Sequence, residues 1–126
     1  IMKDKKLIFM STPMRSGSAL TSRMLNAHSQ VGMIADKLKY FNFCYDRYNP
    51  LTDDNVKKML NDVTARLHVR FDITLNKDEC FHEIQLKTKS DASIYSTLLQ
   101  NIFKGTKKTI IGEVECLSWS RIPTFF

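Results

Sequence analysis

The sequence predicts an α/β fold in which helices flank a parallel sheet. Two short apolar runs, at residues 7–10 and 109–114, have the composition of buried parallel strands. Several segments between them carry apolar residues at helical spacing. No internal repeat, low-complexity tract or Gly/Pro-rich linker divides the sequence. We therefore expect one domain over residues 1–126, with the two strands as parallel neighbours in one sheet.

The first strand is followed by a short polar turn and then by the first helix. The turn, residues 11–18, contains one proline and one glycine. Leu20, Met24 and Leu25 then lie on one side of a helix that we expect over residues 18–28. Strand, tight polar loop and helix thus form the opening unit of the predicted fold.

Later elements are predicted from apolar spacing and capping residues. A second short strand is expected at residues 31–35, and an irregular or partly helical aromatic segment follows at 36–48. Thr52 is a good N-cap for a helix over 53–67, because two aspartates occupy the first turn. A further helix is expected over 91–104. Strands that alternate with helices support the parallel arrangement.

The charge balance favours anionic partners. The chain has 19 Lys and Arg against 13 Asp and Glu, a formal net charge of +6. Nucleic acid, phosphate esters and sulfated sugars all fit such an excess. The densest basic groups lie near the two ends of the chain, and each is interpreted as a solvated surface: Lys3, Lys5 and Lys6, and Lys104, Lys107 and Lys108.

Cysteine usage and hydropathy predict a cytoplasmic protein without a metal. Cys44, Cys80 and Cys116 are odd in number and form no CxxC pair, which argues against a disulfide framework and a zinc site. No apolar stretch approaches 18 residues, so neither a membrane span nor a membrane partner is expected.

The loop between the first strand and the first helix is the most informative segment for function. Backbone N–H groups at a helix N-terminus, with the positive end of the helix dipole, favour a phosphate or sulfate. Gly17 lets the backbone approach an anion, Ser16 and Ser18 add hydroxyls, and Arg15 adds a planar cation. A plain turn into a serine-capped helix is the structural alternative.

The common nucleotide loops fit this segment poorly. A Walker A loop requires Lys before Ser or Thr, and a dinucleotide fingerprint requires three glycines. Here Ala19 and Leu20 follow Ser18, and the loop has one glycine. Another kinase-like phosphate-loop enzyme stays an alternative. So does a non-catalytic basic nucleic-acid-binding module, although no nucleic-acid motif is present and no nucleic-acid partner is expected.

Residues 7–20 with 24–28 resemble the start of the sulfotransferase family. The family's phosphosulfate loop reads P-x-[RK]-S-G-[ST]-[ST]-L, and here Pro13-Met14-Arg15-Ser16-Gly17-Ser18-Ala19-Leu20 stands in its place. Residues 109–113 and 119–123 resemble a later strand and helix. The resemblance implies a P-loop NTPase-like sulfotransferase fold. It also implies metal-free sulfuryl transfer from 3′-phosphoadenosine 5′-phosphosulfate to a hydroxyl or amine of a small-molecule or carbohydrate acceptor.

The sequence departs from the family pattern at Ala19, Ser29 and Val114 and in a missing motif, and two of these departures bear directly on the cofactor. Ala19 stands where Thr or Ser is frequent, which removes a hydroxyl but leaves the backbone N–H. The family's R-D-P-R motif for the 3′-phosphate is absent from the 126 residues. We therefore expect the chain to be the N-terminal portion of a sulfotransferase domain. By itself it should have poor sulfotransferase activity or none. An unpaired sheet edge then predicts homo-oligomers that form through the C-terminal half.

The resemblance also implies roles for single residues. Arg15 would stabilise the charge that develops on the leaving phosphate, and Asp36 would accept the proton of the acceptor group. Independently of the resemblance, Glu113 is expected at the carboxyl edge of the sheet, where it would orient Arg15 or a substrate. The predicted catalytic residues are Arg15 and Asp36, and the predicted binding residues are Arg15, Ser16, Gly17, Ser18, Ala19 and Leu20.

Overall fold

The computed structural model describes residues 5–13 and 17–116. They divide into two units. Unit 1 is built from the chain up to residue 37 and from residue 103 onward, and unit 2 is residues 38–102.

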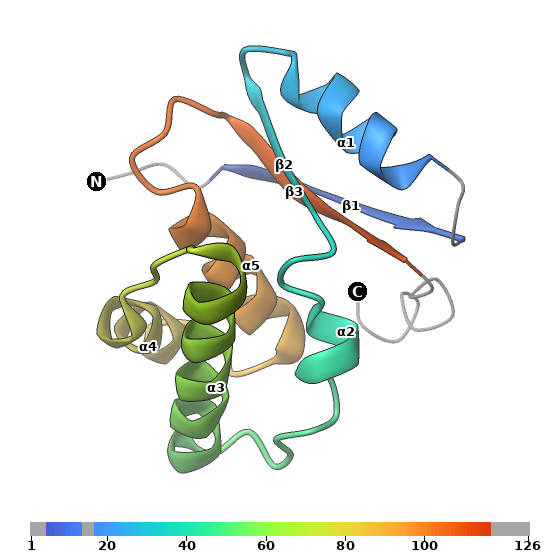
Figure 1. The fold of residues 1–126 in the computed structure, drawn as a ribbon. Helices are drawn as coiled ribbons and strands as arrows, with labels where there is room; N and C mark the ends of the chain where they lie inside the picture. The colour runs from blue at the N-terminus through green and yellow to red at the C-terminus, as the bar shows by residue number, and fades with distance from the viewer. Residues whose placement is uncertain (1–4, 14–16, 117–126) are drawn as a thin grey trace. The chain divides into compact units, whose positions relative to one another are not determined.

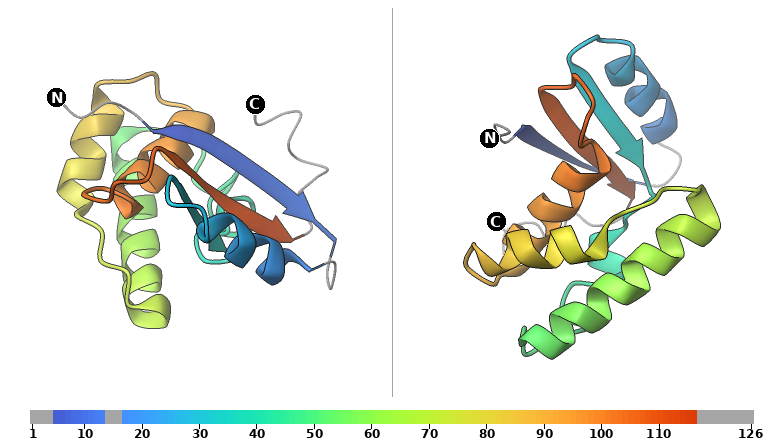
Figure 2. Two further views of the ribbon diagram at one scale, coloured as in Figure 1. Left: turned by 90° about the horizontal axis from the view of Figure 1, so that it is seen from above. Right: turned by 90° about the vertical axis from the view of Figure 1, so that its left-hand side faces the viewer.

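Unit 1 contains a three-stranded parallel sheet. Its strands are β1 (Lys6–Thr12), β2 (Val31–Ala35) and β3 (Ile110–Cys116). β3 lies between the other two, in the order β1-β3-β2 (Figure 1). Figure 2 shows β1 and β3 side by side and running in one direction. The predicted parallel pairing of residues 7–10 with 109–114 is therefore confirmed, as is the coarse α/β class.

One face of the sheet is covered by α1 (Ser18–Asn26). Val31, Met33 and Val114 form a buried cluster, and Leu25 of α1 packs against it. The predicted first helix is confirmed, although it ends at Asn26. Leu20 and Met24, which we expected on the same side as Leu25, are 60% and 67% exposed. A step of one residue rotates a helix by about 100°, so Leu25 can reach the sheet while Met24 does not.

The side chain of Asn26 fixes the end of α1 to the outer strand β2. Its Nδ2 donates to the carbonyl oxygen of Met33 at 2.7 Å, and its Oδ1 accepts from the N–H of Met33 at 2.7 Å. β2 pairs with β3 on its other side. The amide of Asn26 therefore satisfies backbone groups that an outer strand otherwise leaves open.

Unit 2 is helical. It comprises α2 (Tyr40–Phe43), α3 (Asp53–Phe71), α4 (Lys77–Gln85) and α5 (Asp91–Ile102). The predicted helices at 53–67 and 91–104 are confirmed, and Oγ1 of Thr52 caps α3 by accepting from the N–H of Asn55 at 3.3 Å. α4 was not predicted. α3 and α5 supply most of the buried apolar side chains of this unit: Val56, Met59, Leu60, Val63, Leu67, Ile94, Tyr95, Leu98 and Leu99.

A hydroxyl–carboxylate pair joins α2 to α5 within unit 2. The Tyr40 hydroxyl donates to Oδ1 of Asp91 at 2.6 Å, and the Tyr40 side chain is fully buried. Burial, followed by the bond to Asp91, raises the pKa of Tyr40 above its usual value. Burial also raises the pKa of Asp91, and the bond from Tyr40 opposes that rise. The proton therefore stays on Tyr40, which acts as the donor.

Replacing Tyr40 with Phe is expected to lower the free energy of unfolding by about 1–2 kcal/mol, because Asp91 loses its hydroxyl donor. Urea unfolding at neutral pH measures the loss. Tyr48→Phe is the matched control, since the Tyr48 hydroxyl donates to Asp62 at 2.5 Å at an exposed site. An exposed pair contributes little, so its loss should stay below about 0.5 kcal/mol. Equal losses in the two variants would contradict this role of burial.

The helices of the described ranges are too short or too polar to cross a membrane.

Candidate functional site

The carboxyl edge of the sheet is the edge at which Asp36 lies and from which the predicted loop departs. β1 ends at Thr12, β2 at Ala35 and β3 at Cys116. In open parallel sheets, ligands bind outside the carboxyl ends of the strands. Residues 13–20 directly follow β1, and Asp36 directly follows β2. Both predicted segments thus leave the sheet at the same edge.

Gly17 sets the start of α1. It adopts a left-handed conformation, with φ of +86°, which glycine accepts without a steric penalty. An added Cβ would meet no described atom within 4 Å, so the space beside it is open. The predicted residues Arg15 and Ser16 lie outside the described residues, as does the side chain of Ser18. Gly17, Ala19 and Leu20 are all exposed.

The N-terminus of α1 is suited to an external anion. The first intrahelical bond runs from the N–H of Thr21 to the carbonyl of Gly17 at 2.9 Å, so the N–H groups of residues 18–20 precede it. Gly17 provides no side-chain cap, and no acidic residue lies in the first turn. By contrast, α3, α4 and α5 each begin with Asp or Glu in their first turn. α1 therefore presents a positive dipole end without a carboxylate of its own.

Asp36 joins the ends of β2 and β3. Its Oδ1 accepts from the N–H of Cys116 at 3.0 Å, and its N–H donates to the carbonyl of Val114 at 2.9 Å. Its φ is +51°, a left-handed conformation that Asp tolerates better than most residues. These contacts give Asp36 a structural role at the position where the sequence predicted a proton acceptor.

Two residues near Asp36 were not predicted from the sequence. The Cys116 thiol lies 3.4 Å from Oδ2 of Asp36 and 3.7 Å from the Thr12 hydroxyl. Thr12 and Cys116 are the last residues of their strands and are register partners. Each lies two residues beyond the end of a predicted strand, 7–10 or 109–114, so the only available signal was their position just after two strands predicted to be parallel neighbours. The structure thus brings Asp36, Thr12 and Cys116 together at the carboxyl edge.

Glu113 is a fully buried carboxylate within β3. Its Oε2 accepts from the N–H of Lys37 at 3.2 Å. This bond fixes the chain that leaves β2 just after Asp36. Glu113 therefore supports the same edge from inside the sheet, and its predicted contact with Arg15 stays a prediction.

Within the described ranges, no group of three His, Cys, Asp or Glu side chains is arranged to hold a metal ion. Among the described residues, this edge offers backbone N–H groups, the Asp36 carboxylate and the neighbouring Thr12 hydroxyl and Cys116 thiol.

No protein-family model, curated protein or solved structure matches the chain at a significant level.

Two substitutions separate the structural role of Asp36 from a chemical one. Asp36→Asn keeps an oxygen acceptor for Cys116 and should leave the free energy of unfolding within about 0.5 kcal/mol. Asp36→Ala removes the acceptor and should cost about 1 kcal/mol. Thermal and urea unfolding measure both. If Asn destabilises as much as Ala, the negative charge itself holds the strand ends, and the hydrogen bond alone is not the explanation.

Proposed function

We propose that the chain is a sulfotransferase, or the part of one that binds the sulfuryl donor. It transfers a sulfuryl group from 3′-phosphoadenosine 5′-phosphosulfate to a hydroxyl or amine of a small-molecule or carbohydrate acceptor. The observation that carries the proposal is the segment 13–20, which resembles the family's phosphosulfate loop and leads from a parallel strand into α1.

The described residues of the loop fit an oxyanion. An added Cβ at Gly17 would meet no described atom within 4 Å, and the N–H groups of residues 18–20 precede the first intrahelical bond. Phosphate and sulfate oxygens accept hydrogen bonds from such groups, and the helix dipole favours their charge. Ala19 contributes its N–H as well as Thr or Ser would. The loop therefore supports binding of the 5′-phosphosulfate by backbone groups, with Arg15 as the added cation.

The proposed chemistry needs a cation near the leaving phosphate and an acceptor for a proton. Negative charge builds up on the phosphate as the sulfuryl group departs, and Arg15 stabilises it. Asp36 is the candidate proton acceptor, because its carboxylate lies at the carboxyl edge that the loop also leaves. In this role, one carboxylate oxygen of Asp36 would keep its hydrogen bond from the N–H of Cys116, and the other oxygen would accept the proton.

Equilibrium binding of 3′-phosphoadenosine 5′-phosphate tests the proposal. Titration calorimetry should show saturable binding that excess ATP does not displace, because the loop lacks the Walker lysine. ATP that binds as tightly as the bisphosphate, or displaces it, would favour the kinase-like alternative. Binding of neither nucleotide would contradict a nucleotide site in this chain.

A further inference from the structure

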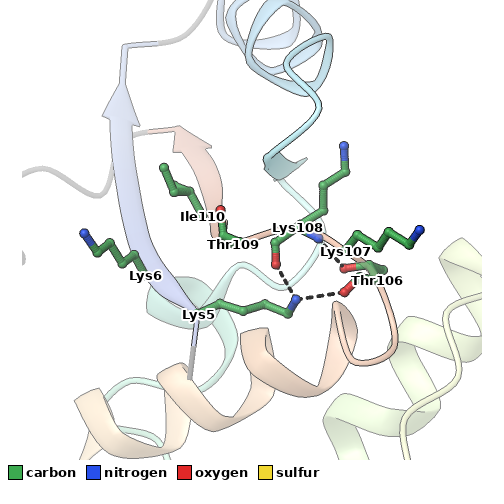
Figure 3. Close-up of a pocket in the computed structure, with 7 residues that line it drawn as sticks. All are labelled: Lys5, Lys6, Thr106, Lys107, Lys108, Thr109 and Ile110. Carbon is green, nitrogen blue, oxygen red and sulfur yellow. Dashed lines mark hydrogen bonds between the residues drawn. The ribbon is translucent and has the colours of Figure 1, made fainter. Parts of the chain in front are cut away.

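A second cationic feature lies at the opposite, amino edge of the sheet. A cavity of about 520 Å³ is lined by residues at the start of β1 and by the loop that precedes β3 (Figure 3). Among the described residues, four lysines and two threonines line it and no acidic residue does: Lys5, Lys6, Lys107, Lys108, Thr106 and Thr109. Four lysines from opposite ends of the sequence, Lys5 and Lys6 from one end and Lys107 and Lys108 from the other, are thus brought together by the pairing of β1 with β3.

Hydrogen bonds to backbone carbonyl groups hold the walls of this cavity together. The Lys5 ammonium donates to the carbonyl of Thr106 at 3.0 Å and also to the carbonyl of Lys108. The N–H of Lys6 donates to the carbonyl of Thr109 at 2.9 Å. These bonds hold the loop before β3 against the first residues of β1, as Figure 3 shows for Lys5. The two segments that line the cavity are therefore held together by hydrogen bonds.

Lys108 is held differently from the two exposed lysines. Its ammonium donates to the carbonyl of Ser29 at 3.2 Å, a partner without formal charge. Lys6 and Lys107 are exposed and extend outward on two sides of the cavity (Figure 3). Across the ranges 5–13 and 17–116, no carboxylate forms an ion pair with Lys6, Lys107 or Lys108. Their flexible four-carbon stems allow the ammonium groups of Lys6 and Lys107 to turn toward a ligand.

We propose that this cavity binds a small molecule that carries two or more phosphate or sulfate groups. Its volume falls within the range of sites for metabolites and cofactors. Ammonium groups on two sides suit a ligand with separated anionic groups better than a single ion. The cavity lies at the amino edge, whereas residues 13–20 leave the carboxyl edge, so it is a site separate from the proposed phosphosulfate loop. The proposal does not depend on sulfuryl transfer.

Calorimetry with tripolyphosphate, a polysulfated disaccharide and inorganic phosphate tests the proposal and distinguishes the two sources of anionic groups. We expect the wild-type chain to bind tripolyphosphate or the disaccharide more tightly than inorganic phosphate, and more weakly as salt is added. The double variant Lys6→Ala/Lys107→Ala should lose at least about tenfold in affinity. Neither lysine side chain makes a hydrogen bond that the fold requires, so the variant should fold normally.

Two controls make the result decisive. Lys58→Ala/Arg70→Ala removes the same charge from exposed positions of α3 and should leave the affinity unchanged. Arg15→Ala should also leave it unchanged, which separates this site from the proposed nucleotide loop. Equal loss in the α3 variant would show non-specific attraction and overturn the proposal. So would the absence of binding, or inorganic phosphate that binds as tightly as the larger anions.

Discussion

Replacing Gly112 with Ala is expected to lower the free energy of unfolding by at least about 3 kcal/mol. Gly112 lies in the central strand β3, opposite Ile8 of β1. An added Cβ would collide with the backbone carbonyl oxygen of Ile8 and would come within 2.8 Å of its carbonyl carbon. A backbone atom cannot turn aside as a side chain can, so β1 would have to move away from β3. Urea unfolding, followed by circular dichroism, measures the loss.

Gly32→Ala provides a graded control in the same sheet. An added Cβ there would approach Cε1 of the Phe103 ring at 2.6 Å. The ring belongs to a side chain that can rotate away, whereas a backbone carbonyl cannot, so this variant should lose less, about 1 kcal/mol. If both variants lose the same amount, the close approach of β1 and β3 is not the cause of the effect at Gly112.

Arg15→Ala is expected to weaken binding of 3′-phosphoadenosine 5′-phosphate by about 1.5–3 kcal/mol, or roughly 10- to 150-fold. A guanidinium binds a phosphate through two charge-assisted hydrogen bonds, and alanine provides neither. The affinity of the Arg15→Lys variant should lie between those of the wild-type chain and Arg15→Ala, because lysine keeps the charge and lacks the planar fork. Titration calorimetry at fixed salt measures all three affinities.

Arg23→Ala is the matched control for Arg15. Arg23 is exposed in the last turn of α1, away from the N-terminus at which the anion is proposed to bind. Its loss removes the same charge and should leave the affinity within about twofold. An unchanged affinity in Arg15→Ala would exclude Arg15 as a ligand, whereas an equal loss in both variants would indicate general attraction by the basic chain.

Most of the elements could be predicted because their signals are local. The apolar run at 7–10 and the one at 109–114 marked β1 and β3, and Thr52 with two following aspartates marked the start of α3. α4 was missed although Asn76 caps it and acidic residues follow. Only Cys80 and Ile84 of its nine residues are buried, so the apolar periodicity was too weak to mark it.

The geometry of the sites depends on pairing between distant parts of the chain. Asp36 could be chosen as a loop carboxylate, but its bond to Cys116 exists only because β2 lies beside β3. The cavity at the amino edge of the sheet could not be predicted from the sequence either. The basic groups to which its lysines belong were each interpreted as solvated surface, and only the pairing of β1 with β3 places Lys5, Lys6, Lys107 and Lys108 around one space.

The position of β3 in the middle of the sheet governs the order in which the sheet can be completed. Within the described ranges, β1 and β2 contact one another only through β3, and Thr12 and Cys116 are 104 positions apart in the chain. During synthesis, both earlier strands emerge before the strand that joins them exists. The helices of unit 2, which are continuous in sequence, lie in the intervening loop. Closing that loop costs chain entropy before any strand pairing compensates. Because its strands come from distant parts of the chain, we expect formation of the sheet of unit 1 to be the slow step of folding.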